Sequence, residues 1–186
     1  EVIDVLSLQA KYDEGQWDVN HNGELYQRCI DRRPLFIVYG EYNWHDYIIE
    51  CDLYNNSGAT QNPFGHPGIV FHAKEDKSFF VVYFRPHSSD TGKAVQYATV
   101  DKEGTLKGVS TYKTVVPDKE WFSVKLHVKS SKGKVEIFCK GENVGTVCIA
   151  SGGCGAVGLF QHQQLGRFRN FKCTHIKKWS SVKKDE

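Results

Sequence analysis

The 186-residue sequence contains no methionine, only five prolines and no long apolar run. A membrane-spanning helix needs about 20 consecutive apolar residues, so the sequence predicts no membrane span, and it shows no signal peptide. No window repeats apolar residues at the helical period, and we therefore expect almost no helix. Because the chain starts at Glu1 and lacks methionine, we expect a processed or excised form of a longer protein.

The sequence also has little excess of positive over negative charge. Lysine and arginine total 24 against 22 aspartate and glutamate residues, which gives a net charge of +2. A nucleic-acid-binding protein usually concentrates positive charge on one face, and this sequence scatters both signs, so that class is excluded. The one basic cluster lies in residues 177–186, which we expect to be a flexible tail following a single domain of residues 1–176.

The cysteines lack any Cys-X-X-Cys spacing, which argues against zinc and permits up to three disulfides. Asn55-Asn56-Ser57 is an N-glycosylation sequon. Together these features favour a secreted, extracellular protein with at least one disulfide. A direct bridge between Cys139 and Cys148 is disfavoured because the hairpin between them offsets the two positions. The sequence leaves the pairing open among Cys29, Cys51, Cys139, Cys148, Cys154 and Cys173.

The composition favours strands, since aromatic residues make up 13% of the chain and 17 glycines supply turns. In residues 47–54 the apolar side chains fall on alternate positions, as in a strand with one buried face. About ten such strands without helices predict an all-β fold, a sandwich of two antiparallel sheets. The other expected strands are residues 68–73, 78–85, 94–100, 109–116, 121–128, 134–139, 145–149, 156–162 and 166–175.

A series of short motifs follows a fixed order over most of the chain. It resembles the laminin-G-like and glucanase-like jelly rolls of the concanavalin A superfamily. The resemblance implies a two-sheet jelly roll but no single function, because this fold hosts lectins, glycosidases and adhesion modules. The motifs are Gly15-Gln16-Trp17, Gly23-Glu24-Leu25, Trp44-His45-Asp46-Tyr47, Gly68-Ile69-Val70-Phe71, Gly155-Ala156-Val157-Gly158 and Phe168-Arg169-Asn170-Phe171.

The resemblance also assigns places to three of the tryptophans. Trp17, Trp44 and Trp121 match family positions that pack at the edges of the sandwich, so we expect all three in the core.

Glucanases of this fold resemble one another in a strand motif Glu-X-Asp-X-X-Glu, whose carboxylates act as nucleophile and acid/base. Here Glu50 and Asp52 supply the first two carboxylates, but Asn55 occupies the third position. An amide cannot donate and retake a proton. We therefore predict that the chain is not an enzyme, with a glycoside hydrolase of rearranged site as an alternative.

Alternation along residues 78–85 assigns the two faces of one strand. Phe80, Val82 and Phe84 should be internal, so Tyr83 and Arg85 should point outward.

The outward residues of three successive strands suggest a binding surface. Glu50 and Asp52 share one strand face, His72 lies on the next strand, and Tyr83 and Arg85 lie on the one after. If these strands are neighbours, the five side chains form one polar and aromatic surface, which suits a sugar. The alternative is an ordinary solvated face with a salt bridge between Asp52 and Arg85.

Asp18, Asn20 and Asn22, followed by Gly23, match the opening of an acidic calcium loop, which places oxygen ligands at alternate positions. Cys29 at the twelfth position rules out an EF-hand, and a plain hairpin turn is the alternative. No motif requires a cofactor, and calcium is the one candidate.

The sequence therefore predicts a non-catalytic extracellular module that binds a glycan or glycoprotein. A structural or adhesion domain of an extracellular matrix is the alternative, and the oligomeric state stays open.

Overall fold

The computed structural model describes residues 1–29, 33–56, 66–162 and 165–179. Its regular structure is almost entirely β, as expected, and none of the described helical turns is long and apolar enough to cross a membrane. The helical elements in these ranges are three 3-10 turns, η1 (Val5–Ser7), η2 (Pro86–Ser88) and η3 (Ser130–Lys132).

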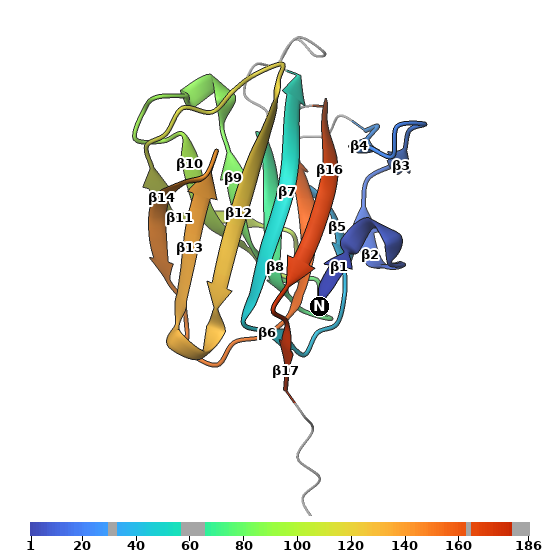
Figure 1. The fold of residues 1–186 in the computed structure, drawn as a ribbon, viewed down its shortest axis with the longest axis vertical. Coiled ribbons are helices and arrows are strands. Elements are labelled where there is room, and N and C mark those ends of the chain that lie inside the picture. The colour runs from blue at the N-terminus through green and yellow to red at the C-terminus, as the bar shows by residue number, and fades with distance from the viewer. Residues whose placement is uncertain (30–32, 57–65, 163–164, 180–186) are drawn as a thin grey trace, which may run out of the picture.

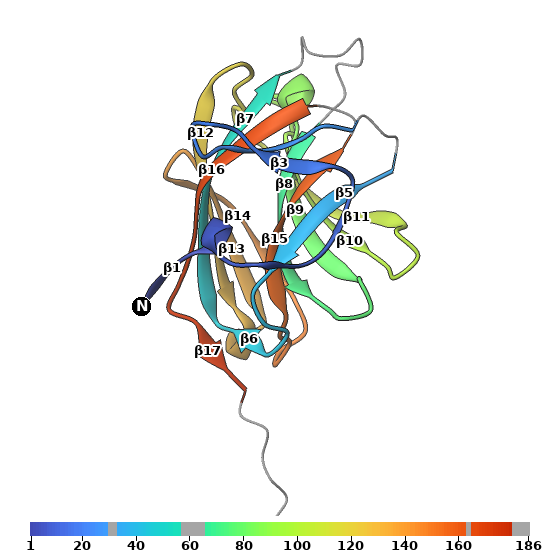
Figure 2. The ribbon, with the colours of Figure 1, turned by 90° about the vertical axis from the view of Figure 1, so that its right-hand side faces the viewer.

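Two large antiparallel sheets pack face to face (Figure 2), which confirms the predicted all-β sandwich. The sheet in front in Figure 1 has eight strands. Its order is β14 (Glu142–Cys148), β13 (Lys134–Cys139), β12 (Trp121–Lys129), β7 (Tyr47–Asn56), β16 (Leu165–Thr174), β4 (Leu25–Gln27) and β3 (Trp17–Val19), with β1 (Val2–Asp4) also paired to β16.

The sheet behind it has seven strands. Its order is β11 (Leu106–Tyr112), β10 (Val95–Val100), β9 (Phe79–Phe84), β8 (His66–Ala73), β15 (Ala156–His162), β5 (Leu35–Tyr39) and β2 (Ala10–Glu14).

The main core lies between the sheets and is built by alternation. On β7, the positions from Tyr47 to Leu53 are alternately buried and accessible, so Ile49, Cys51 and Leu53 face the other sheet. A fully buried aliphatic or aromatic side chain contributes about 1.5–3 kcal/mol relative to an exposed one. One face of this strand therefore anchors the sandwich, and the other face is available to solvent.

Strand β5 is absent from the sequence-based prediction. All five of its residues, Leu35–Tyr39, are buried, so the strand shows no alternation. A short apolar run of this kind cannot be assigned from periodicity alone. The available signal was its position between Pro34 and Gly40, which are residues that bound strands.

Strand β9 alternates as predicted, but its second face is also buried. Val82 and Phe84 belong to the core between the sheets. Val81 and Tyr83 belong to a second apolar cluster on the outer side of the seven-stranded sheet, together with Phe160. Tyr83 is only 4% exposed. The prediction of an outward, solvent-facing Tyr83 is therefore wrong, because the sheet is apolar on both sides.

The expected core positions of the tryptophans are only partly correct. Trp44 is buried, and the half-buried Trp17 packs against the core with its ring 6.0 Å from that of Phe168. Trp121 instead lies on the outer face of the eight-stranded sheet, where it is partly exposed.

No disulfide joins the cysteines, all six of which lie within the described residues, so the predicted bridge is contradicted. Cys139 faces Glu142 and Cys148 faces Lys134 across the β13–β14 hairpin, which confirms that these two do not pair. Buried thiols pack as small apolar side chains, as Cys51 does in the core. The free cysteines are Cys29, Cys51, Cys139, Cys148, Cys154 and Cys173.

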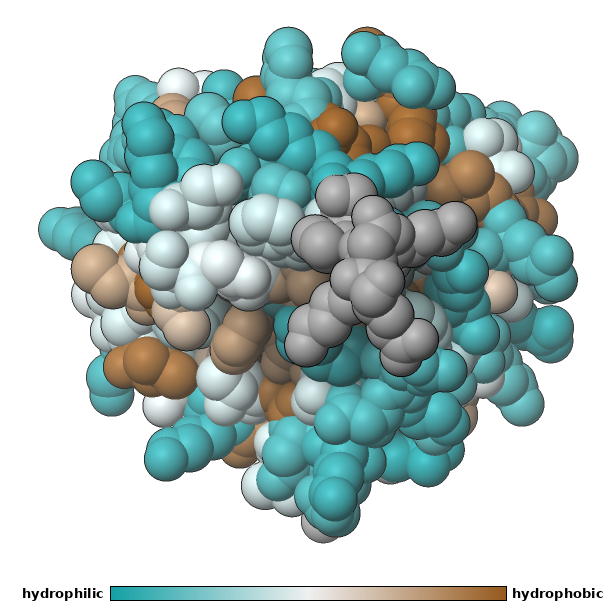
Figure 3. All heavy atoms as spheres, turned by 90° about the horizontal axis from the view of Figure 1, so that it is seen from below, coloured by the Kyte–Doolittle hydropathy of each residue, from teal (hydrophilic) through white to brown (hydrophobic). Residues whose placement is uncertain are grey.

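The domain continues past the predicted boundary at residue 176. Strand β17 (Lys177–Lys178) pairs with β6 (Trp44–His45) at the lower end of the sandwich. The ring of Trp179 then stacks on His45, with centroids 3.8 Å apart. Figure 3 views this end, where hydrophilic residues cover much of the surface. Residues 177–179 are therefore part of the fold, and the rest of the predicted tail lies outside the described residues.

Candidate functional site

A row of four side chains crosses the outer face of the eight-stranded sheet. Trp121 of β12 lies opposite Tyr54 of β7, Tyr54 lies opposite Arg167 of β16, and Arg167 lies opposite Tyr26 of β4. Directly opposed residues project from the same side of a sheet. All four are partly exposed. We refer to Tyr26, Tyr54, Trp121 and Arg167 as the aromatic–arginine row.

Arginine side chains hold the aromatic rings of this row in place. The Arg167 guanidinium carbon lies 4.2 Å from the centre of the Tyr54 ring, and that of Arg169 lies 4.0 Å from the centre of the Trp121 ring. The Tyr54 and Trp121 rings are 5.4 Å apart. Such stacking fixes side chains that otherwise lose freedom when a ligand binds, so it lowers the entropic cost of binding.

Asp52 supplies a fixed carboxylate beside the row. It accepts hydrogen bonds from Ser123 Oγ at 2.7 Å, Asn170 Nδ2 at 2.8 Å and Arg169 Nε at 3.4 Å. Burial would raise the pKa of Asp52, but these hydrogen bonds outweigh it and lower the pKa. The side chain is therefore an ionised acceptor held in one orientation.

A bulge in β16 brings two consecutive residues to Asp52. The register with β7 shifts between Arg169 and Lys172, and Asn170 has a φ of 53°. A bulge re-aims side chains that regular alternation would send to opposite faces. Arg169 and Asn170 consequently both reach the same carboxylate.

The other arginine is held by Glu24, which directly precedes β4. Glu24 Oε2 accepts from Arg167 Nη1 at 3.0 Å and from Asn20 Nδ2 at 2.9 Å. The hydrogen bond from Asn20, together with the charge of Arg167, lowers the pKa of Glu24 despite its burial. The hairpin that carries Glu24 is thereby tied to the sheet face.

The residues of the predicted calcium loop form that same hairpin. Asn20 Oδ1 accepts the backbone N–H groups of Asn22 and Glu24, and Asp18 pairs with Arg28 at 3.7 Å. These contacts are those of a polar turn. Within the described ranges, no three His, Cys, Asp or Glu side chains converge as metal ligands. Calcium binding here stays a prediction.

Two hollows lie on either side of the Tyr54–Trp121 pair. The first has a volume of about 480 Å³ and the second about 380 Å³. Both are within the range of small-ligand sites. The first is lined by Tyr26, Tyr54 and Arg167 among others, and the second by Asp52, Trp121 and Arg169 among others.

The five predicted sugar-binding residues do not come together. Glu50 and Asp52 lie on β7 in the eight-stranded sheet, whereas His72, Tyr83 and Arg85 belong to β8, β9 and the residue after β9 in the other sheet. The assumption that consecutive strands are neighbours fails here, because β7 pairs with β12 and β16. The predicted ion-pair alternative between Asp52 and Arg85 fails for the same reason, and Asp52 pairs with Arg169.

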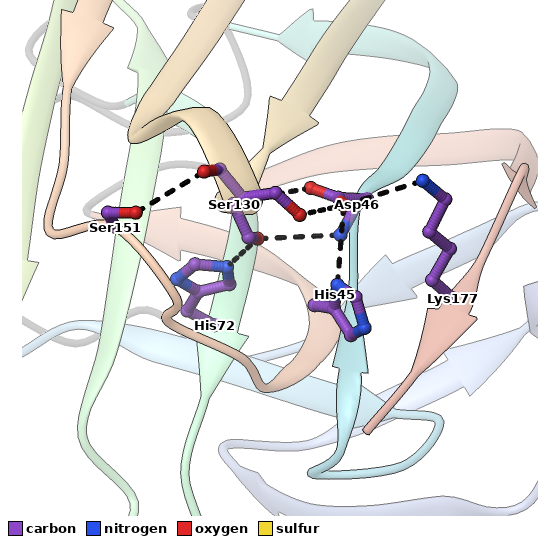
Figure 4. A network of polar contacts seen from close by, with 7 residues as sticks. His45, Asp46, His72, Ser130, Ser151 and Lys177 are labelled. Atoms are coloured by element: carbon purple, nitrogen blue, oxygen red, sulfur yellow. Dashed lines mark hydrogen bonds and ion pairs between the residues drawn. The ribbon is translucent and has the colours of Figure 1, made fainter. Parts of the chain in front are cut away.

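The residues of the seven-stranded sheet have structural surroundings of their own. His72 is buried and its Nε2 lies 2.8 Å from Ser130 Oγ (Figure 4). Burial lowers the pKa of His72 to about 4. Tyr83 stacks on His66, and Arg85 Nη2 lies 3.1 Å from His87 Nε2. The prediction is therefore corrected: the candidate site does not include His72, Tyr83 or Arg85.

Sequence reasoning missed Trp121 and both arginines, although a signal existed. Phe122 and Val124 are buried on β12, and Phe168 is buried on β16. Alternation alone places Trp121 and Arg169 on the opposite face. The family resemblance, which assigned Trp121 to the core, outweighed that pattern.

Asn55 was predicted as a glycosylation site and occupies the third position of the glucanase-like motif, and its position in the fold bears on both. Its side chain is 0% exposed, and Nδ2 donates to Asp118 Oδ1 at 3.0 Å. A glycan cannot be attached to this buried amide in the folded domain, so the prediction of glycosylation at Asn55 is contradicted. The third position of the glucanase-like motif also points away from the face that carries Glu50 and Asp52.

No protein-family model matches the chain. Solved structures match it over nearly its whole length. The carbohydrate-binding module CBM66 from Bacillus subtilis superposes with a TM-score of 0.73 at 16% identity, covering 92% of this chain and 98% of that one. A Bacillus subtilis protein described as having a galectin-like fold gives 0.64 at 12% identity, covering 90% of both chains.

The Lotus tetragonolobus seed lectin gives a TM-score of 0.62 at 10% identity, covering 97% of this chain and all of that one. The fold is a concanavalin A-like jelly roll. The finer laminin-G-like assignment is not confirmed by these matches, and identities this low establish the fold alone.

Proposed function

We propose that this protein is a non-catalytic carbohydrate-recognition module that binds a glycan across the aromatic–arginine row. The single observation that carries the proposal is the partly exposed Trp121 ring, held by Arg169 beside the fixed carboxylate of Asp52. The fold, which the chain shares with a carbohydrate-binding module and a seed lectin, supports the same ligand class. An extracellular setting remains part of the proposal.

The chemistry of the row matches that of a sugar. The apolar face of a sugar ring stacks on an aromatic side chain, and its hydroxyl groups bridge carboxylates and guanidinium groups. The row crosses four adjacent strands, a span of about 14 Å at the usual strand spacing. Trp121, Tyr54 and Tyr26 provide the rings, and Asp52 and Arg167 provide acceptor and donor.

The same face is poorly suited to glycoside hydrolysis. A retaining glycosidase needs one carboxylate as nucleophile and a second, protonated one as acid. The pKa of Asp52 is lowered, so this group does not hold a proton to donate. Glu50 lies opposite Lys125 and Lys172, and Asn55 faces the interior. These positions support recognition without catalysis.

A glycan array followed by calorimetric titration of the best ligand tests the proposal. Trp121→Ala should weaken binding roughly 30-fold, as expected for an aromatic side chain at the centre of a binding site. Trp179→Ala is the matched control, because Trp179 is 44% exposed and packs on His45 away from the row. Equal loss in both variants, or no glycan bound, would overturn the proposal and favour the adhesion-domain alternative.

The retained glycan should also be recovered intact after prolonged incubation with the protein. Chromatographic detection of shorter products that disappear in Glu50→Gln would establish the hydrolase alternative.

A further inference from the structure

A further hollow, lined by basic residues, lies at the far end of the same sheet face. It has a volume of about 420 Å³. Its walls come from Asp46 and the start of β7, from β12, the η3 turn, the residue after β16, and β17. We refer to it as the basic hollow, and its charged and titratable lining residues are Asp46, His127, Lys129, Lys132, His175 and Lys177.

The single carboxylate of the basic hollow, that of Asp46, already has hydrogen-bond and ion-pair partners within the protein. Asp46 accepts the backbone N–H of Ser131 at 2.8 Å and also its hydroxyl group, and Lys177 Nζ lies 3.8 Å from its carboxylate (Figure 4). His45 Nδ1 approaches the same carboxylate at 3.4 Å. Burial would raise the pKa of Asp46, but the Ser131 hydrogen bonds, followed by His45 and Lys177, lower it. Asp46 is therefore a neutralised, fixed anion.

The cationic groups of the hollow are only partly matched. Lys129 pairs with Glu136, which lies outside the hollow on β13. The side chains of Lys132 and His175 make no hydrogen bond or ion pair with any residue that the structure describes. Three lysines thus share the hollow with one carboxylate. Clustered charge of one sign raises the local concentration of the opposite ion.

We propose that the basic hollow binds an oxyanion group, a sulfate or phosphate, either free or carried by a sugar. Ammonium and imidazolium groups are the donors that such oxygens accept in charge-assisted hydrogen bonds. The sugar-borne form rests on the proposed function, whereas binding of the free ion does not. His127 is six residues from Trp121 along β12, about 20 Å at the usual rise, so the hollow is separate from the aromatic–arginine row.

Binding at the basic hollow should strengthen as the pH falls. His127 faces Glu136 at 3.8 Å on β13, Lys125 and Lys129 lie on its own strand, and His175 follows β16. Ile48 of β7, directly opposite, is apolar. Burial, then Lys129, lowers the pKa of His127 from 6.5. An anion favours protonated histidine, and linkage therefore makes affinity rise as His127 gains a proton.

Calorimetric titration at low salt tests this with four probes: persulfated maltotetraose, unsulfated maltotetraose, inorganic sulfate and inorganic phosphate. We expect a sulfate-bearing or phosphate probe to bind. The affinity for the sulfate probes, whose charge is constant in this range, should rise roughly threefold from pH about 7.5 to about 5.5. Binding of persulfated maltotetraose but not of free ions identifies a sugar-borne group, and binding of both identifies the oxyanion itself. The affinity for unsulfated maltotetraose should be unchanged by substitutions in this hollow.

The decisive variants remove two positive charges from different places. Lys132→Ala with Lys177→Ala should weaken oxyanion binding roughly tenfold. Lys102→Ala with Lys107→Ala is the control, because both residues are exposed near β11 in the other sheet and the change in net charge is the same. Equal loss in the two double variants, or no binding of any anionic probe, would overturn the proposal. Trp121→Ala should leave inorganic sulfate binding unchanged, which separates this test from that of the proposed function.

Discussion

The guanidinium carbon of Arg169 lies 4.0 Å from the centre of the Trp121 ring, although their strands, β16 and β12, are separated by β7. The two side chains meet above the intervening strand, where Arg169 also reaches Asp52. One arginine therefore couples the aromatic ring to the carboxylate. We expect this coupling to control both the orientation of Trp121 and the affinity of the face for a sugar.

Replacing Arg169 with lysine tests that coupling. Arg169→Lys keeps the charge but removes the planar group that stacks on Trp121. Glycan affinity should fall roughly twofold to fivefold, because an exposed cation–π contact is worth about 0.5–1 kcal/mol. Arg85→Lys, in the other sheet, should have no effect on affinity. Calorimetry on both variants checks this, and equal affinity of Arg169→Lys and wild type would contradict it.

The buried His72 should make the fold sensitive to acid. Its pKa is lowered to about 4 in the folded protein, mainly by burial, from 6.5. The unfolded chain therefore binds a proton first, and stability should fall as the pH drops from about 6.5 towards about 4, by about 3 kcal/mol. Below that range this residue contributes no further change.

The measurement is the free energy of unfolding in urea as a function of pH. His72→Gln keeps a polar group near Ser130 but removes the titration. The variant should be less stable at neutral pH and show a flatter dependence between pH about 4 and about 6.5. A slope as steep as that of the wild type would assign the acid sensitivity to other residues.

Tyr83 should matter for stability rather than for binding. Because Tyr83 lies in the second apolar cluster, Tyr83→Ala should cost about 3–5 kcal/mol, comparable with Phe84→Ala in the main core. Tyr54→Ala is the matched control, since Tyr54 is partly exposed on the outer face of β7 and its loss opens no enclosed cavity. Chemical denaturation of the three variants checks the order, and a Tyr83→Ala variant as stable as Tyr54→Ala would contradict it.

The turn before β6 should not tolerate a side chain at Gly40. Gly40 has a φ of 90°, and a Cβ atom there would lie 2.4 Å from the Trp44 ring. Gly40→Ala should therefore destabilise the fold by more than about 1 kcal/mol through strain and displacement of Trp44. Gly92→Ala, which meets open space, is the control and should stay within about 1 kcal/mol of wild type. Thermal unfolding of the pair would settle the comparison.

The strands that the sequence predicted are those with one buried face. Residues 47–54 and 121–128 alternate, and they became β7 and β12 with bounds shifted by only one or two residues. Alternation is a local property, since it depends only on which side of the sheet each residue occupies. Strand β5 was missed because it is buried on both faces and shows no alternation.

The order of the strands within the sheets could not be predicted from local periodicity. Strands β8 and β9 follow β7 in the chain but lie in the other sheet, so Asp52 of β7 and Tyr83 of β9 never meet. Asp52 instead meets Arg169, 117 positions away. The sequence by itself determined the all-β class and, through alternation, the two faces of most strands, because those depend on local periodicity. Only the tertiary structure decided which faces of the sheets stay in solvent and which side chains lie together on the same face. The reason is that sheet order is set by packing between distant segments.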